Sequence, residues 1–276
     1  MKIGFFTQNS KKGGLDTFII ELLSHWPEGD ELLLFCNNSH PGLKNIQQKV
    51  PSFVSIIPYK FMILQDLKIN FNSWSILYKF FLKIFFWLFG FHYQIYVLYH
   101  FLKNHNLDKL LIINGGYPAG EACLASIVAW AKINPDNKAW HNLHNMVEPL
   151  PSNIIRRLKN KWIDKIISEN IAGFISVSKT CSDSITNRKI FHEIEKKFIY
   201  NGISPLKHRK IKNLKKELGL PLNAFILLML GVYETRKGHH FMFQVMEQVI
   251  KEIPEAHLIV CGDGTEKEIQ IVENLR

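Results

Sequence analysis

The amino-acid sequence predicts a doubly wound α/β fold. Short apolar runs that suit strands alternate along the chain with longer segments of helical spacing. A length of 276 residues and a hydrophobic composition of 47% are enough to bury a large core, in two domains or in one large one. Alternation of this kind is typical of a parallel sheet with helices on both faces, where ligands bind at the carboxyl ends of the strands.

The individual elements follow from the same pattern. The apolar runs predict strands at residues 2–7, 31–36, 53–57, 109–113, 138–143 and 172–177. Segments with apolar residues at helical spacing predict helices at residues 15–26, 119–132, 152–170 and 179–190.

The strand and helix pattern begins afresh near the end of the sequence. After "IYNGISP" comes a basic amphipathic stretch, "LKHRKIKNLKKELGLP", which Gly219 and Pro221 close, and a new strand starts at Ala224. We therefore expect one domain at residues 1–204 and a second at residues 205–276. The second has two predicted strands, too few to finish a core, so we expect it to be incomplete and the chain to be cut short.

Residues 68–103 interrupt the alternation. No acidic residue lies between Asp66 and Asp108, and aromatic residues crowd the sequence "FNSWSILYKFFLKIFFWLFGFHYQIYVLYHF". Lys83 and Lys103 bracket 19 residues, close to the roughly 20 residues that a membrane span needs.

A membrane span is nevertheless disfavoured for this segment. His92, Gln94 and His100 interrupt it, and predicted strands of one sheet lie on both sides of it. One or two helices lying in a membrane interface fit better, with Lys79 and Lys83 one turn apart and available to lipid phosphates. Packing of the aromatic residues in the core is the alternative, and the sequence leaves both open.

The net charge indicates which partners the protein could bind, and the cysteine content indicates its redox compartment. The 34 Lys and Arg residues against 24 Asp and Glu give a net charge of +10, which favours a membrane surface, a nucleic acid or a phosphorylated small molecule. Cys36, Cys123, Cys181 and Cys261 lie too far apart for a zinc motif, so we expect buried free thiols in a reducing compartment. The N-terminal apolar stretch is too short for a signal peptide. These features predict a cytoplasmic protein.

The sequence "LGVYETRKGHHF" places a lysine where a strand turns into a helix. Gly231 and Lys237 fit the spacing of a phosphate-binding P-loop, but Arg236 replaces its second glycine and Gly238 its hydroxyl residue, which excludes that motif. A lysine at a helix N-terminus can still bind an anion together with the unpaired N–H groups. The alternative is a solvated turn lysine.

Other candidate residues follow predicted strands. Gly13 and Gly14 precede a helix, where bare backbone can approach a phosphate. The G-x-G-x-x-G fingerprint is absent there, and "CGDGTE" supplies only Gly262 and Gly264, which disfavours a nicotinamide or flavin enzyme. His144 closes the strand in "AWHNLHN" and would stand at its carboxyl end, where either a structural or a functional role is open.

Several segments, in order and spacing, are similar to parts of one enzyme family. They are "GGLDTFIIELLSHWPEGDELLLFCN", "GFISVSKTCSDSI", "KKFIYNGI" and "LMLGVYETRKGHHFMFQVMEQVIKEIPEAHLIVCGDGTEKEI". The last is the most specific, because strand, K-G pair, helix and P-x-x-x-L-x-x-x-G-x-G recur with the same lengths. The chain thus resembles the family 4 retaining glycosyltransferases over nearly its whole length, apart from the aromatic segment.

The resemblance implies a GT-B fold, in which two facing doubly wound Rossmann-like domains bind a nucleotide sugar in the cleft. It implies that Lys237 reaches the donor diphosphate, that Gly14 approaches it from the other domain, and that His144 lies near the transferred sugar. His141 is the less favoured match for that histidine. The residues that the resemblance assigns to donor binding are Gly13, Gly14, Arg236, Lys237, Gly262 and Gly264. It implies neither a metal nor another cofactor.

Two features depart from the family pattern. Val232 stands where an arginine is common, so Arg236 is the candidate to supply that charge. The acidic E-x-x-x-x-x-x-x-E segment that holds the sugar and ribose normally lies beyond the last residue of this sequence.

The expected function is therefore that of a cytoplasmic hexosyltransferase, peripheral on the inner face of the cytoplasmic membrane. Its acceptor would be a lipid-linked or cell-envelope saccharide, as in polysaccharide or lipopolysaccharide biosynthesis. The alternative is a truncated, inactive remnant that binds a membrane or a partner subunit. Nucleic-acid binding through residues 207–216 is disfavoured, because that basic run has no interleaved aromatic residues.

Overall fold

The computed structural model describes residues 1–60, 76–118, 120–205 and 213–275; in residues 76–84, 86 and 88 it describes the helix but not the side chains. The chain divides into two compact units, Met1–Ser204 and Pro205–Arg276. Each unit is described here by itself.

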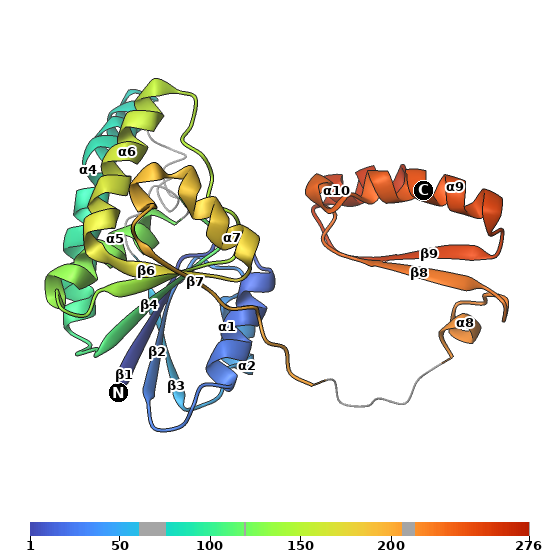
Figure 1. Cartoon of the computed structure of the whole chain (residues 1–276), viewed down its shortest axis with the longest axis horizontal. Coiled ribbons are helices and arrows are strands. Elements are labelled where there is room, and N and C mark those ends of the chain that lie inside the picture. The colour runs from blue at the N-terminus through green and yellow to red at the C-terminus, as the bar shows by residue number, and fades with distance from the viewer. Residues whose placement is uncertain (61–75, 119, 206–212, 276) are drawn as a thin grey trace. The chain divides into compact units, whose positions relative to one another are not determined.

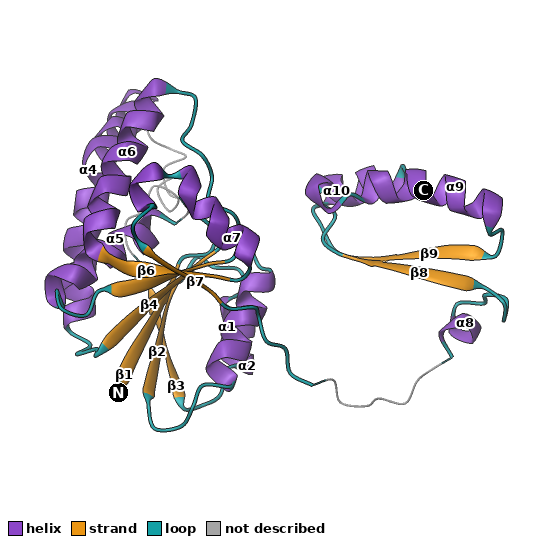
Figure 2. Cartoon of the chain, in the orientation of Figure 1, coloured by secondary structure: helices purple, strands orange, loops and turns teal. Residues whose placement is uncertain are grey.

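The first unit is built on a seven-stranded parallel sheet (Figures 1 and 2). Its strand order is β3-β2-β1-β4-β5-β6-β7. The strands are β1 (Lys2–Thr7), β2 (Glu31–Asn37), β3 (Val54–Tyr59), β4 (Lys109–Asn114), β5 (Ala139–Leu143), β6 (Ile171–Ser176) and β7 (Glu195–Phe198). The doubly wound α/β class that the sequence predicts is confirmed.

Helices cover both faces of this sheet (Figure 2). On one face lie α1 (Gly14–Ser24) and α2 (Leu43–Lys49), and on the other lie α4 (Ile76–Lys103), α5 (Glu121–Ile133) and α6 (Ile154–Asn170). The burial pattern of β2 shows that apolar side chains on both faces of the sheet need to be covered. Leu32 and Leu34 join the cluster beneath α1, whereas Leu33 and Phe35 join the cluster beneath α5. Because both faces are covered, the strand is a continuous apolar run.

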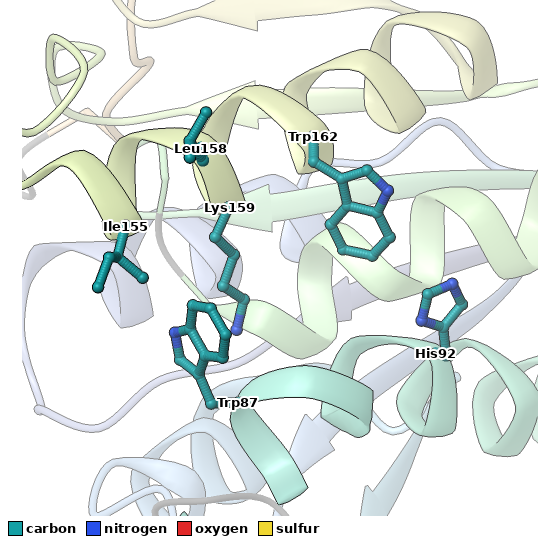
Figure 3. A pocket seen from close by; sticks show the side chains of 6 residues that line it. All are labelled: Trp87, His92, Ile155, Leu158, Lys159 and Trp162. Carbon is teal, nitrogen blue, oxygen red and sulfur yellow. The ribbon is translucent and has the colours of Figure 1, made fainter. Parts of the chain in front are cut away.

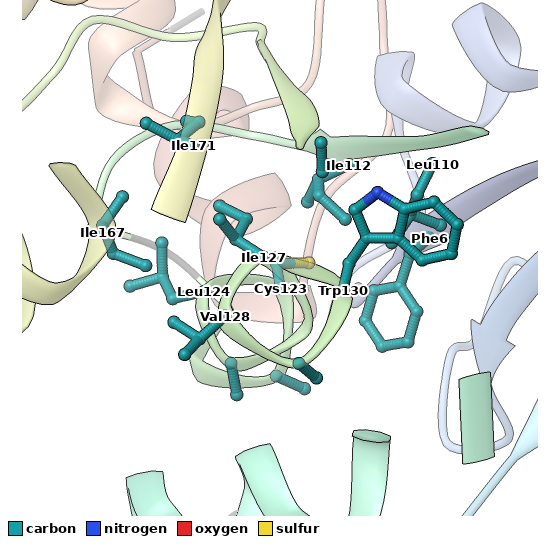
Figure 4. Packing of buried hydrophobic residues seen from close by; sticks show 14 of the residues in the cluster. Phe6, Leu110, Ile112, Cys123, Leu124, Ile127, Val128, Trp130, Ile167 and Ile171 are labelled. Carbon is teal, nitrogen blue, oxygen red and sulfur yellow. The ribbon is translucent and has the colours of Figure 1, made fainter. Parts of the chain in front are cut away.

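Helix α5 forms the centre of the larger core. Its residues Ala122–Ala131 are all buried, so it is apolar on every side, as expected of a helix enclosed by other elements. It packs between the sheet and α4. Figure 4 shows side chains of α5 directed toward Phe6 and Ile112 of the strands and toward Ile167 of α6.

The structure corrects one predicted helix. Residues 179–190 do not form a continuous helix: α7 (Lys179–Asp183) is followed by the 3₁₀ turns Ser184–Asn187 and Lys189–Phe191. Arg188, between the two turns, has an extended backbone and a buried guanidinium that contacts Asp164. Pulling this side chain into the interior ends the helical run. Helix α2 was not predicted, and β7 was anticipated only through the family resemblance.

Residues 76–103 of the aromatic segment form helix α4, and residues 68–75 lie outside the described part of the chain. Phe91, Ile95, Leu98 and Leu102 are buried in the core. Other aromatic side chains are exposed, among them Tyr96 at 66%. The core-packing alternative is therefore confirmed for one face of α4, whereas another face is open, and the membrane-interface interpretation stays a prediction. Lys79 and Lys83 have no described side chains. Within the described ranges, no helix is long and apolar enough to cross a membrane.

The second unit contains a strand, helix, strand, helix succession. The elements are α8 (Leu214–Glu217), β8 (Phe225–Leu230), α9 (His239–Glu252), β9 (Ala256–Cys261) and α10 (Glu266–Glu273), and β8 pairs with β9 in parallel. Of the predicted basic amphipathic stretch, only the short α8 is described as helix.

Cys36, Cys123 and Cys181 are buried free thiols as predicted. The prediction is wrong for Cys261, which is exposed at the end of β9.

Candidate functional site

The strand order of the first unit reverses direction beside β1, which is a topological switch point. The chain runs from β1 outward to β2 and β3, then returns to place β4 on the other side of β1. Loops on either side of such a switch point diverge and leave room for a ligand. Here the loop of residues 8–13 follows β1, and the loop of residues 115–120 follows β4.

The Gly13–Gly14 turn lies in the first of these loops. Helix α1 begins at Gly14, and the Gly13 amide donates to Asp16 Oδ2 at 3.2 Å. A methyl group added at Gly13 or at Gly14 would meet nothing within 4 Å. The protein itself therefore does not require glycine there for packing, and the open space beside the backbone is available to a ligand.

A buried hydrogen bond between a histidine and an aspartate holds this turn. His40 Nε2 lies 2.9 Å from Asp16 Oδ1, and both side chains are almost completely inaccessible. A side chain at Gly42 would overlap both groups. The contact links the first turn of α1 to the loop after β2. Sequence reasoning missed it, and the available signal was an aspartate in the first turn of a helix that follows two glycines.

His144 reaches the same edge of the sheet from β5. Its Nε2 lies 2.6 Å from Asn142 Oδ1, an acceptor, which places the proton on Nε2 and leaves Nδ1 as an acceptor. Its ring packs edge-on against Phe18 of α1, with centroids 4.2 Å apart. Burial lowers the pKa of His144 to about 4, so the ring is neutral at pH 7. Its Nδ1 can accept a hydrogen bond, and the ring carries no positive charge.

His141 occupies a different environment on the same strand. Its side chain is fully buried, with its ring beside those of Tyr117 and Phe174. Burial lowers its pKa to about 3. His141 therefore belongs to the core, and of the two histidines it is His144 that stands at the strand end.

A buried polar network fixes the loops after β4 and β5. Tyr117 Oη donates to Asp164 Oδ1 at 2.6 Å, and Arg188 Nη1 donates to Asp164 Oδ2 at 3.0 Å. The Glu148 amide donates to the Tyr117 carbonyl at 2.8 Å, and Arg188 Nε donates to the Glu148 carbonyl at 2.7 Å. These residues come from distant parts of the sequence, so no local pattern could reveal the network.

Lys237 lies at the corresponding edge of the second unit. It ends the 3₁₀ turn Thr235–Lys237 that joins β8 to α9, and Gly238 follows in the left-handed region at φ 76°. The Lys237 stem packs beside Gly231, whose added Cβ would meet it at 3.7 Å. In the described part of the chain, the exposed ammonium group of Lys237 forms no hydrogen bond or ion pair. It is therefore an available cation at the N-terminus of α9.

Arg236 is placed differently from its neighbour. Its Nε lies 2.5 Å from Glu234 Oε2, and 64% of its side chain is exposed. The nearby carboxylate already balances its charge. Arg236 is thus a weaker candidate than Lys237 for replacing the arginine that the family pattern has at position 232.

The two glycines after β9 differ from Gly13 and Gly14. A side chain at Gly262 would overlap the Gly231 carbonyl, so glycine is needed there for the close approach of two strand ends. An added Cβ at Gly264 would lie 3.1 Å from the Tyr233 Cβ. Packing inside the unit accounts for Gly262 without a ligand. Among the described residues, no group of three or more His, Cys, Asp and Glu side chains is placed to hold a metal ion.

A known protein family matches residues within the second unit of the chain. Residues 210–275 match the model of the family described as "Glycosyl transferases group 1". This part of the sequence is similar to the group 1 glycosyl transferases. The match contains the strand, turn and helix that carry Lys237. No curated protein matches the chain.

A solved structure resembles the chain in fold. A UDP-N-acetylglucosamine 2-epimerase structure from Listeria monocytogenes aligns over 100% of this chain with a TM-score of 0.50 and 10% identity. A second such epimerase, from Rickettsia bellii, has a TM-score of 0.39 and 9% identity, with 65% of its own length covered. At this identity the first likeness shows the fold alone. The chain spans 66% of the length of that first structure.

Proposed function

We propose that the protein is a retaining glycosyltransferase that moves a hexose-type sugar from a nucleotide-sugar donor to an acceptor hydroxyl. The observation that carries the proposal is Lys237, an unpaired cation at the N-terminus of α9 within the segment that matches the group 1 family. An ammonium group beside free helix amides is a site for an anion such as a diphosphate.

The proposed reaction breaks the bond between the anomeric carbon and the donor diphosphate oxygen. Negative charge then builds on the diphosphate, and preorganised cations and amides stabilise it. In the second unit, Lys237 supplies the charge. In the first unit, the open backbone at Gly13 and Gly14 is a separate candidate for contact with a phosphate. The acceptor oxygen attacks from the same face, and its proton passes to the leaving diphosphate. No metal is needed for this charge balance.

His144 would act next to the transferred sugar. Because burial keeps its ring neutral, its role is to position a sugar hydroxyl by hydrogen bonding, with Asn142 fixing the ring through the 2.6 Å contact.

The acceptor we propose is a lipid-linked saccharide of the cell envelope, at the inner face of the cytoplasmic membrane. The net charge of +10 supports an anionic membrane surface as the place where the protein acts. A non-catalytic domain that binds a membrane or partner is the second candidate, favoured by the exposed aromatic residues of α4.

Replacement of Lys237 tests the proposal. The chain would be screened against a panel of nucleotide sugars, with binding measured by calorimetry and turnover by release of the nucleoside diphosphate. Lys237→Ala should lower turnover by about 10²-fold, because it removes a preorganised charge from the transition state. Lys251→Ala is the matched control, since Lys251 lies exposed at the other end of α9. Equal turnover by Lys237→Ala and wild type would make Lys237 a solvated turn residue.

Gly14→Ala separates ligand binding from folding in the same assay. The added methyl group meets no protein atom within 4 Å, so the unfolding free energy should change little. Nucleotide-sugar binding should nevertheless weaken, because the methyl group occupies space that the phosphates need. Unchanged binding by Gly14→Ala would remove this turn from the donor site. If neither the wild type nor the variants bind any nucleotide sugar, the non-catalytic alternative is preferred.

A further inference from the structure

An apolar groove of about 310 Å³ lies between α4 and α6 of the first unit (Figure 3). Trp87 and His92 rise from α4 toward the side chains of Lys159 and Trp162 on α6. Ile155 and Leu158 complete its lining. The α6 residues recur at i, i+3, i+4 and i+7 and thus form one stripe along the helix.

The rim of this groove exposes an unusual amount of apolar surface. On α6, Ile154, Ile155 and Leu158 are 61%, 57% and 61% exposed. On α4, the exposed aromatic side chains are Phe85, Trp87, Phe89, Tyr93 and Tyr96. Single exposed apolar residues are ordinary, but this many on the two helices that line one groove indicate a surface that contacts something apolar.

Cations surround the patch and carboxylates are scarce. Helix α6 carries five basic residues, which are Arg156, Arg157, Lys159, Lys161 and Lys165. Of its two acidic residues, Asp164 is buried and paired with Arg188, and Glu169 lies in the last turn. The sequence of α4 contains no acidic residue.

Lys159 shows how apolar and charged groups share this surface. Its Nζ lies 5.7 Å from the ring centroid of Trp87, and 3.8 Å from Glu121 Oε1 at the start of α5. The aliphatic stem of Lys159 therefore lines the groove, and Glu121 balances the charge of its ammonium group on a side chain that is 20% exposed.

We propose that the face formed by α4 and α6 docks the first unit on an anionic lipid bilayer. Exposed Trp, Tyr and aliphatic side chains with a basic border are the features of a helix surface that enters the headgroup region. A second copy of this chain is a poorer occupant, because a symmetric contact would set the cations of one α6 against those of the other. The inference deepens the proposed function, since it names the surface that brings a lipid-linked acceptor to the enzyme.

Vesicle flotation tests the proposal with the full chain. The protein should float with vesicles of phosphatidylcholine that contain about 30% phosphatidylglycerol, and much less with pure phosphatidylcholine. Raising the salt from about 0.1 M to about 0.5 M should release it, because the headgroup attraction is screened. Trp162→Phe should remove part of the blue shift in tryptophan fluorescence that anionic vesicles induce.

Paired variants identify the surface. Arg156→Gln with Lys161→Gln should weaken vesicle binding roughly 30-fold, because each cation near an anionic surface contributes about fivefold. Ile155→Ser with Leu158→Ser should weaken it roughly tenfold through lost apolar burial. The matched controls are Lys251→Gln with Lys267→Gln for charge, and Phe53→Ser for an apolar residue that is 59% exposed elsewhere on the first unit. The controls should bind as the wild type does.

Three results would overturn the inference. They are flotation that is equal with both kinds of vesicle, flotation that the α6 variants leave unchanged, and a concentration-dependent dimer that Ile155→Ser with Leu158→Ser abolishes. The last would assign the face to a second copy. These outcomes are independent of nucleotide-sugar binding, so a failure here and a failure of the proposed activity can be told apart.

Discussion

Strands β2 and β8 have similar sequences and opposite environments. In β2, "ELLLFCN", every residue after the first is buried. In β8, "FILLML", none is, and Leu228 and Leu230 are 56% and 71% exposed. The difference lies in what surrounds each strand. β2 has a strand on both sides and helices on both faces, whereas β8 pairs only with β9.

This contrast shows that an apolar run specifies a strand without specifying its burial. A parallel strand becomes core only when neighbouring strands and two helical layers exclude water from it. The first unit supplies those layers and holds its site loops with buried pairs such as Asp16–His40. The second unit presents Lys237 on a short turn with little buried structure behind it. We therefore expect the turn that carries Lys237 to be less rigid than the loops of the first unit.

Matched phenylalanine truncations should give the largest difference between the units. Phe35→Ala in β2 removes a ring that is 0% exposed and should lower the free energy of unfolding by about 3–5 kcal/mol. Phe225→Ala in β8 removes a ring that is 54% exposed and should cost about 1 kcal/mol or less. Urea unfolding followed by tryptophan fluorescence reports the first unit, because all six tryptophans lie before residue 205.

Hydrogen exchange of the β8 amides would report the second unit. Similar losses for the two variants would contradict the contrast in burial, and would mean that β8 is covered in solution.

Acid should destabilise the first unit through its buried histidines. Burial lowers the pKa of His141 to about 3 and that of His144 to about 4, from 6.5. Between these values and 6.5 the unfolded chain binds protons that the folded chain does not, so stability falls as the pH falls. From pH 7 to pH 5, His141 should cost about 2 kcal/mol, and the less buried His144 should cost less because solvent screens it.

His141→Met should reduce the difference in unfolding free energy between pH 7 and pH 5 by about 2 kcal/mol. His192→Gln is the control, because the His192 side chain is 72% exposed. Unchanged pH dependence in His141→Met would show that the ring is not held neutral in the core.

Two glycine substitutions should give the smallest effect and compare the site loops directly. Gly238 lies at φ 76°, so Gly238→Ala should destabilise the start of α9 by about 1 kcal/mol. Gly13 is extended at φ 173° with open space beside it, so Gly13→Ala should change the stability of the first unit by less than about 0.5 kcal/mol. Hydrogen exchange of the α9 amides and urea unfolding would measure the two effects. An equal cost at both positions would show that the loop around Gly13 is packed more closely than the structure indicates.

Much of the secondary structure could be predicted from local patterns. Each strand that the apolar runs predict in the first unit is present, with ends shifted by no more than two residues. The helix over residues 179–190 was wrong because Arg188 turns inward to a carboxylate on another helix. The candidate residues His144 and Lys237 stand at strand ends, and their roles remain predictions. The pairing of Asp16 with His40 and the pairing of Arg236 with Glu234 could not be predicted, because residue spacing does not show which side chains are in contact.

The sequence by itself determined the alternation of strands and helices, the positive charge, and the turn that sets a lysine before α9. These are local properties, set by side-chain polarity at fixed spacing and by glycine at positions that need it. Only the tertiary structure decided which apolar residues became core. In the aromatic helix α4, Phe91 is buried against α5 while Trp87 opens onto the groove beside α6. Burial depends on which neighbour covers a helix face, and periodicity cannot supply that neighbour.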